Sequence, residues 1–233
     1  MSEALDKVRG VRELPIFPLP LVLFPGAPLP LHIFEERYRR MLADVRASNN
    51  LFGLSYFVPE AAEDRPPAGH VGCATEVVEA QPLPDGRSNI LTLGVARYRV
   101  AEYVERGEPY LVARVEFFED DVEDAEVVGR RAAEVAGMFT RIARAMRAAN
   151  QERGAQPELP GDDPERLSFM VAAVVEMDAE AKQRLLETRS TSERLRRLHA
   201  MLAQAVDAYE ARARAHELSR GNGHAGKQID FEE

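Results

Sequence analysis

The sequence has little of what disulfide-bonded, membrane-spanning and nucleic-acid-binding proteins require. Its single cysteine, Cys73, excludes an internal disulfide, and no apolar run approaches the ~18 residues of a membrane span. Charges occupy the start of the chain, where a secretory signal would place its apolar core. Basic residues number 30 against 39 acidic ones, and the net charge of −9 argues against general binding to a phosphate backbone. We therefore expect a cytoplasmic protein without membrane or nucleic-acid partners.

What the sequence does contain is typical of a folded globular protein. Of its 233 residues, 45% are hydrophobic and 30% are charged, which is enough apolar material for a core. The length allows one large domain or two small ones. The character of the sequence changes near residue 119, from strand-like to helical.

The first half consists of short apolar runs interrupted by proline and glycine, a pattern that predicts strands. The predicted strands are Leu14 to Leu19, Pro30 to Phe34, Leu51 to Phe57, Val71 to Val78, Ser88 to Val95, Tyr98 to Val104 and Tyr110 to Phe118. Asp85-Gly86 lies between two runs and predicts a hairpin turn. Proline is dense from Pro15 to Pro30, and since proline cannot donate to a central ladder, this segment is expected at an edge or in a crossing.

Amphipathic spacing predicts the helices. One interrupts the strands at Glu35 to Ser48, and the others follow residue 119. The inward-facing residues expected on them are Tyr38, Met41, Leu42 and Val45; then Val128, Ala132, Val135, Phe139, Ile142 and Met146; then Leu167, Met170, Val171 and Val174; then Leu185 and Leu186; and finally Leu195, Leu198, Met201, Leu202, Val206 and Tyr209. Asp163 before Pro164, Asp178, and Ser190 with Glu193 are predicted N-caps.

Catalytic and metal-binding motifs are largely missing. The five histidines have no metal-ligand spacing with one another or with Cys73, and neither GxSxG nor HExxH occurs. His70 and Cys73 would lie on opposite faces of a strand, so we interpret Cys73 as a packed core residue. The glycine-rich stretch at 221–228 matches a phosphate-binding loop up to its last residue, where Gln228 replaces the required hydroxyl. We interpret it as part of a mobile tail.

Two charged features have ordinary interpretations. The acidic run from Glu119 to Glu126 is expected to be a solvated linker and helix start, with a docking patch or cation contact as the alternative. Arginines crowd two predicted helices, at Arg141, Arg144 and Arg147 and again at Arg194, Arg196 and Arg197. These are expected to be solvated helix faces, with an acidic partner or RNA as the alternative.

The most specific stretch is Leu14 to Met41, which reads LPIFPLPLVLFPGAPLPLHIFEERYRRM. It resembles the N-terminal LON domain of ATP-dependent Lon proteases, and in particular short bacterial proteins that consist of this domain alone. The elements that carry the resemblance are Pro18-Leu19, Phe24-Pro25-Gly26, Pro30-Leu31, Ile33-Phe34-Glu35 and Arg37-Tyr38, with support from Val71 to Ala74, Leu83 to Gly86, Gly94 to Val100 and Met177 to Glu187.

The resemblance implies an α+β fold in which a PUA-like β pseudobarrel with one helix precedes a helical bundle. The strand-then-helix pattern points the same way. We predict a β-rich part at 1–118, a helical part at 119–216 and a flexible tail at 217–233. The ATPase and Ser–Lys protease modules of a complete Lon protease do not fit after Tyr209, so we expect no enzymatic activity and no cofactor or metal.

The leading hypothesis is a non-catalytic module that recognises unfolded or hydrophobic polypeptide, or a protease or chaperone, in protein quality control. Phe34, Arg37 and Tyr38 are the candidate partner-binding residues, because apolar and aromatic surface flanked by charge suits exposed hydrophobic segments. The competing interpretation gives this stretch only turn and core roles, with Gly26 at positive φ. The alternative function is RNA binding through the barrel, which rests on fold analogy alone. A hydrolase is the third hypothesis, and Cys73, Ser55 and Ser168 are the side chains that would test it.

Overall fold

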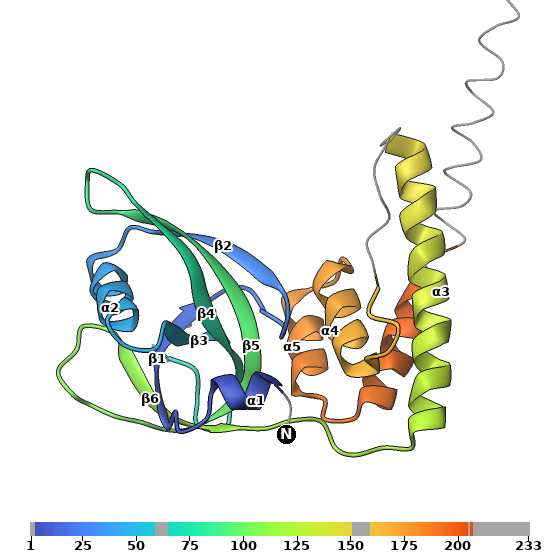
Figure 1. The fold of residues 1–233 in the computed structure, drawn as a ribbon, viewed down its shortest axis with the longest axis horizontal. Helices are drawn as coiled ribbons and strands as arrows, with labels where there is room; N and C mark the ends of the chain where they lie inside the picture. Colours follow the sequence, from blue (N-terminus) through green and yellow to red (C-terminus); the bar gives the residue numbers. More distant parts are fainter. Residues whose placement is uncertain (1–2, 59–64, 151–158, 205, 207–233) are drawn as a thin grey trace, which may run out of the picture.

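A computed structural model describes residues 3–58, 65–150, 159–204 and 206. A barrel of strands fills one side of the molecule and a group of helices fills the other (Figure 1), which confirms the predicted α+β class. Within the described ranges, no helix combines the length and apolarity needed to cross a membrane. The glycine-rich stretch at 221–228 and the predicted tail lie outside the described residues.

Six strands form one mixed sheet. They are β1 (Glu13–Leu19), β2 (Pro28–Ile33), β3 (Leu51–Tyr56), β4 (Val71–Pro82), β5 (Ser88–Tyr103) and β6 (Leu111–Phe117). The strand order is β2-β5-β4-β3-β1-β6, and additional pairing between β5 and β6 closes five of the strands into a ring. Among the described strands, β2 pairs with β5 alone and so remains an edge outside the ring. The predicted barrel is confirmed.

One strand prediction was wrong: Ser88 to Val95 and Tyr98 to Val104 are a single strand, β5. Ala96 and Arg97 continue its ladder opposite Ala74 and Cys73 of β4. Register shifts in the pairing of β5 with β4 and β6 mark where the ladder is irregular. The two predicted strands are separated in the sequence by Ala96 and Arg97. Arg97 is a buried charged residue within the strand, and the chain does not turn there.

The prolines lie where pairing permits them. In β1, Pro15 is opposite Val112 of β6 and Pro18 is opposite Ser55 of β3. The β6 pairing covers Glu13 to Ile16 and the β3 pairing covers Ile16 to Leu19, so each half of β1 is paired on one side. β1 is therefore the predicted crossing segment, and β2, with its own prolines, is the predicted edge.

The long β4–β5 hairpin turns at Asp85-Gly86, as predicted. Gly86 has φ +81°, and its amide donates to the Leu83 carbonyl oxygen at 3.0 Å. A Cβ at Gly86 would lie 2.0 Å from a terminal guanidinium nitrogen of Arg39, so the hairpin tip touches α2 (Glu36–Arg46). The inward face predicted for α2 is confirmed, because Tyr38, Met41, Leu42 and Val45 are all buried.

The remaining described helical residues are α1 (Glu3–Lys7), α3 (Ala125–Asn150), α4 (Pro164–Val174), α5 (Ala179–Glu187) and the stretch 191–204 with residue 206. The predicted caps are confirmed: Asp163 accepts from the amide of Arg166, Asp178 from that of Ala181, and Ser190 from that of Glu193. The inward faces are also confirmed, although Met170 and Met201 are only half-buried and two predicted residues are exposed. Met146 is 42% exposed and Val174 is 62% exposed, because each lies near the end of its helix. Tyr209 lies outside the described residues.

α4 and α5 lie between the barrel and α3 (Figure 1). One hydrophobic cluster crosses this boundary, since Phe24 and Val71 of the first half pack with residues of α3, α4, α5 and 191–204. The barrel and the helices therefore share a core.

A buried group of charges, which we call the junction cluster, consists of Arg97, Asp120, Ser168 and Arg194. Asp120 forms ion pairs with both arginines, and all three charged side chains are 5% exposed or less. Arg194 also donates to the Ser168 hydroxyl at 2.7 Å. The predictions that Asp120 belongs to a solvated linker and Arg194 to a solvated helix face were therefore wrong, because each is the other's buried counter-charge.

Candidate functional site

A groove with a volume of about 550 Å³ opens where the end of β1, the end of β2, the start of α2 and the segment before β6 meet. Its lining is largely aromatic and aliphatic, and the main apolar contributors are Phe17, Leu19, Leu31, Phe34, Tyr38, Phe57 and Tyr110. The charged side chains among the lining residues are Glu35, Arg37 and Glu108. A concave apolar surface with a few polar groups is the usual form of a binding site.

All three predicted binding residues line this groove, but they are not equivalent. Phe34 is 60% exposed, whereas Tyr38 is 6% exposed and belongs to the barrel core. The Tyr38 ring packs on Phe17 with centroids 4.1 Å apart. Burial raises the pKa of the Tyr38 hydroxyl, so this group stays protonated at neutral pH. Tyr38 is thus a fixed wall of the groove, whereas Phe34 exposes its aromatic ring at the groove surface.

Phe34 is supported on one side by His32. The two rings stack with centroids 6.1 Å apart and an interplanar angle of 22°. His32 is held in turn by the Asn89 side chain, whose Oδ1 lies 2.7 Å from His32 Nδ1. A stacked yet exposed phenyl ring is positioned without being buried, which leaves apolar surface available to a ligand.

Arg37 is exposed and already has partners. Its Nε donates to Glu35 Oε2 at 2.9 Å, and its guanidinium lies 4.5 Å from the centroid of the Tyr38 ring. Exposed ion pairs of this kind contribute about 0–1 kcal/mol. The guanidinium of Arg37 is therefore neutralised by Glu35 and forms a flat surface beside Phe34. It is not an unpaired cation.

The sequence analysis missed Tyr110 and Phe57 as groove residues. The Tyr110 hydroxyl donates to Asp44 Oδ2 at 2.9 Å, and burial together with this bond raises its pKa to about 12. Tyr110 and Asp44 are 66 residues apart. No local pattern could have placed Tyr110 beside α2.

The three side chains considered as candidate nucleophiles, Cys73, Ser55 and Ser168, have structural roles. Cys73 is fully buried, and this burial raises the pKa of its thiol to about 12, which disfavours the reactive thiolate. The prediction that Cys73 is a packed core residue is confirmed. The Ser55 hydroxyl is buried and lies 2.8 Å from the Tyr98 hydroxyl. Ser168 belongs to the junction cluster, where its hydroxyl donates to the Glu165 carbonyl oxygen at 2.6 Å.

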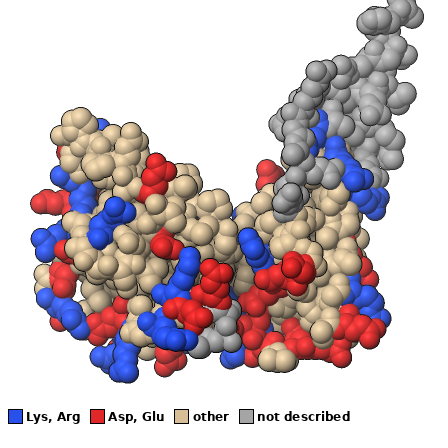
Figure 2. Space-filling view, viewed as in Figure 1, with Lys and Arg blue, Asp and Glu red and all other residues tan. Residues whose placement is uncertain are grey.

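The potential metal ligands and the distribution of charged side chains both bear on ligand class. In the described part of the chain, no group of three or more His, Cys, Asp or Glu residues could hold a metal ion. Acidic and basic side chains are interspersed along the lower part of the molecule in Figure 2, and charged side chains are sparser above them. Arg141 and Arg144 are exposed on α3, as predicted.

Comparison with known proteins gives consistent matches. The model of the substrate-binding domain of ATP-dependent protease La (LON) matches residues 13–204. Lon protease 2 of Herpetosiphon aurantiacus is 27% identical over 201 residues, which are 85% of this chain and 24% of that protein. The Lon protease of Anaeromyxobacter dehalogenans is 30% identical over 191 residues, which are 75% of this chain and 21% of that protein. The chain thus spans about a quarter of the length of these relatives.

Solved structures share the fold. A Lon N-terminal domain protein from Xanthomonas campestris matches with a TM-score of 0.60 at 24% identity, covering 82% of this chain and 98% of the other. The N-terminal domain of a Mycobacterium avium complex Lon protease matches with a TM-score of 0.62 at 18% identity, with the same coverage. At these identities the structural matches concern the fold alone.

Proposed function

Because the chain belongs to the family of LON substrate-binding domains, we propose that it is a non-catalytic module that binds unfolded or hydrophobic polypeptide in protein quality control. The observation that carries this proposal is the exposed Phe34 side chain on an apolar groove of about 550 Å³. An apolar surface that a folded protein leaves open marks a site of interaction.

In this proposal, one or two apolar side chains of the ligand enter the groove. Phe34 and Phe57 contact them from the open side, while the buried Tyr38 ring forms a fixed wall. Such a site selects for exposed apolar side chains more than for a particular sequence, because the hydrophobic effect is non-directional. A folded protein, whose apolar side chains are buried, is then a poor ligand.

The edge of the sheet next to the groove is unsuited to binding by strand addition. β2 is the edge strand, and Pro28 and Pro30 provide no N–H groups for a ladder. Peptide recognition by strand addition depends on main-chain hydrogen bonds to such an edge. We therefore attribute recognition to the side chains of the groove.

Binding of a permanently unfolded, fluorescently labelled polypeptide, followed by anisotropy, tests the proposal. We expect Phe34→Ser to weaken binding about tenfold, the effect typical of an exposed aromatic contact residue. Val174→Ser is the matched control, since Val174 is similarly exposed, at 62%, on the helical side. Equal weakening by the two variants would contradict the proposed site, and no binding at tens of micromolar by the unaltered protein would contradict the function.

A further inference from the structure

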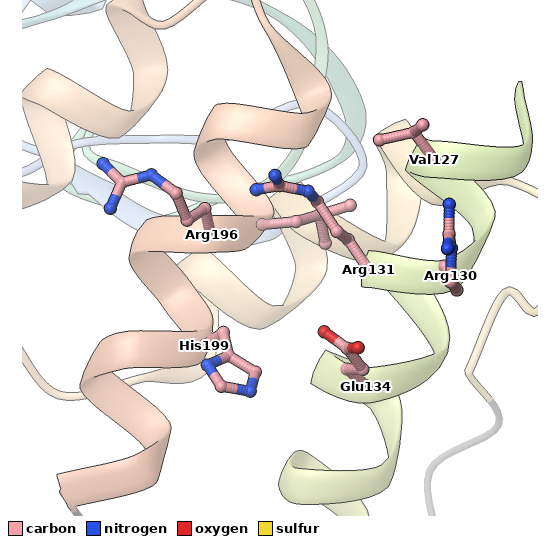
Figure 3. A pocket seen from close by; sticks show the side chains of 7 residues that line it. Val127, Arg130, Arg131, Glu134, Arg196 and His199 are labelled. Atoms are coloured by element: carbon pink, nitrogen blue, oxygen red, sulfur yellow. The ribbon is translucent and has the colours of Figure 1, made fainter. Parts of the chain in front are cut away.

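A second cavity lies in the helical part of the molecule, between α3 and helical residues 191–204 (Figure 3). Its volume is about 320 Å³. α3 contributes Val127, Arg130, Arg131 and Glu134, and the facing helix contributes Leu195, Arg196 and His199. Arg131, Glu134 and His199 point into the gap between the helices (Figure 3). We call this the helical cavity.

The charges around the helical cavity are unequally compensated. Arg196 is neutralised by two hydrogen bonds of 2.7 Å to the Glu193 carboxylate. Arg130 lies 4.0 Å from Glu126, and both side chains are largely exposed, so this pair is weak. Arg131 donates to the Ser192 carbonyl oxygen at 3.3 Å and has no carboxylate partner among the described residues. Of the three arginines that line the helical cavity, Arg131 is thus the one without a carboxylate partner among the described residues.

Glu134 gives the helical cavity a second polar group. Its carboxylate forms no ion pair or hydrogen bond with any other residue in the described ranges, although it faces the same gap as Arg131. A ligand between the two side chains would need an acceptor for Arg131 and a donor for Glu134. A polypeptide has both, because an acidic side chain can accept from the guanidinium while a backbone N–H donates to the carboxylate.

We propose that the helical cavity binds an acidic segment of a partner polypeptide, with Arg131 pairing to a carboxylate of that segment. Val127 and Leu195 form an apolar wall for an aliphatic side chain next to that carboxylate. This site is separate from the groove at Phe34 and does not depend on the function proposed for it.

The lining disfavours a nucleic-acid ligand. No phenylalanine, tyrosine or tryptophan is among the seven described lining residues, so the platform on which nucleobases stack is missing there. Glu134 would repel a phosphate, and the net charge of −9 opposes the approach of a polyanion. A short peptide with a few carboxylates meets these obstacles to a smaller degree.

Titration of the full chain with a labelled glutamate- and leucine-containing peptide at low salt tests the proposal. Arg131→Gln is expected to weaken binding at least about fivefold, since it removes a charge-assisted contact. Arg144→Gln is the matched control: it removes the same charge from the same helix but does not line the helical cavity. Glu134→Gln keeps an acceptor and removes the repulsion, so binding should be unchanged or tighter.

Several results would overturn the proposal. They are the absence of peptide binding at low salt, equal weakening by Arg131→Gln and Arg144→Gln, a loss of binding in Glu134→Gln, or a preference for a single-stranded oligonucleotide over the peptide. Thermal unfolding of each variant checks that it is folded. If Arg131→Gln fails this check, Arg130→Gln, which alters an exposed side chain of the same cavity, takes its place and is expected to weaken binding more than Arg144→Gln does.

Discussion

Two of the sites where an arginine lies over an aromatic ring, the junction cluster and the groove, differ in burial. In the junction cluster, the Arg194 guanidinium lies 3.9 Å from the centroid of the Phe169 ring, and its side chain is fully buried. In the groove, Arg37 lies 4.5 Å from the centroid of the Tyr38 ring, and its side chain is 53% exposed. The same contact therefore fixes the structure in one place and presents a surface in the other.

The difference in burial determines what each region can do. A buried charge must have a partner, so the junction cluster joins the barrel to the helices through Asp120. The charged residues of the groove do not need a partner in the protein, because they are exposed and water solvates them. We expect changes in the junction cluster to alter stability and changes in the groove to alter binding.

The largest expected effect comes from removing the shared counter-charge of the junction. Asp120→Ala leaves the buried Arg194 without a carboxylate and leaves the buried Arg97 only a 3.9 Å contact with Glu165, so it should lower the free energy of unfolding by about 3–5 kcal/mol. Urea denaturation measures this loss. Asp121→Ala is the control from the next position, because Asp121 pairs with Arg189 on the surface and should change stability by about 0.5 kcal/mol or less. Similar losses in the two variants would contradict the assignment.

The next effect contrasts a packed site in the barrel with an open site on the helices. A Cβ at Gly72 would lie 2.5 Å from the Tyr98 hydroxyl oxygen and 2.6 Å from the Leu54 carbonyl oxygen. Gly72→Ala should therefore cost about 1–3 kcal/mol. Gly137→Ala on α3 meets no atom within 4 Å and should stabilise by about 0.5–1 kcal/mol. Effects of the same sign, measured by thermal unfolding, would refute this contrast.

A smaller effect is expected at Arg37. Arg37→Gln removes an exposed ion pair with Glu35, so stability should change by about 0.5 kcal/mol or less. Binding of unfolded polypeptide should weaken by about threefold or less, because Arg37 borders the ligand without supplying an uncompensated charge. Parallel unfolding and anisotropy measurements separate the two quantities. A large loss of stability would place Arg37 with the buried arginines.

The smallest expected effect is a change in how stability depends on pH under acidic conditions. Hydrogen bonds from Arg196 and Arg197 lower the pKa of Glu193 to about 2. A folded-state pKa below the unfolded value contributes stability above the unfolded pKa of about 4.3 and loses it as the pH falls towards 2. Glu193→Gln should only slightly flatten the pH dependence of stability in this window, since the Glu193 side chain is 32% exposed and water screens its ion pairs. An unchanged pH profile would show that these bonds do not persist in solution.

Local signals in the sequence were sufficient for much of the fold. Helix caps at Asp163, Asp178 and Ser190, and the turn at Asp85-Gly86, depend on neighbours within a few residues, so the sequence displays them directly. The edge and crossing positions of the proline-rich segment also followed from the missing N–H groups.

What the sequence did not reveal depends on distant partners. Asp120 and Arg194 are 74 residues apart, and each resembles a solvated charge in its own segment. One signal could have helped: Arg97 lies in a run of β5 that is buried on both faces, where a charge requires a counter-charge. Phe34, Arg37 and Tyr38 are close in sequence and all line the groove, whereas Tyr110 reaches the groove through the barrel topology.

We propose that polypeptide binds at Phe34 and not across the apolar surface in general. A photoreactive amino acid placed at position 34, and separately at position 174, tests it by cross-linking to an unfolded polypeptide. We predict strong cross-linking from position 34, competed away by excess unlabelled polypeptide, and only background from position 174. Equal cross-linking from both positions, or none from position 34 under conditions where the polypeptide binds, would contradict the claim.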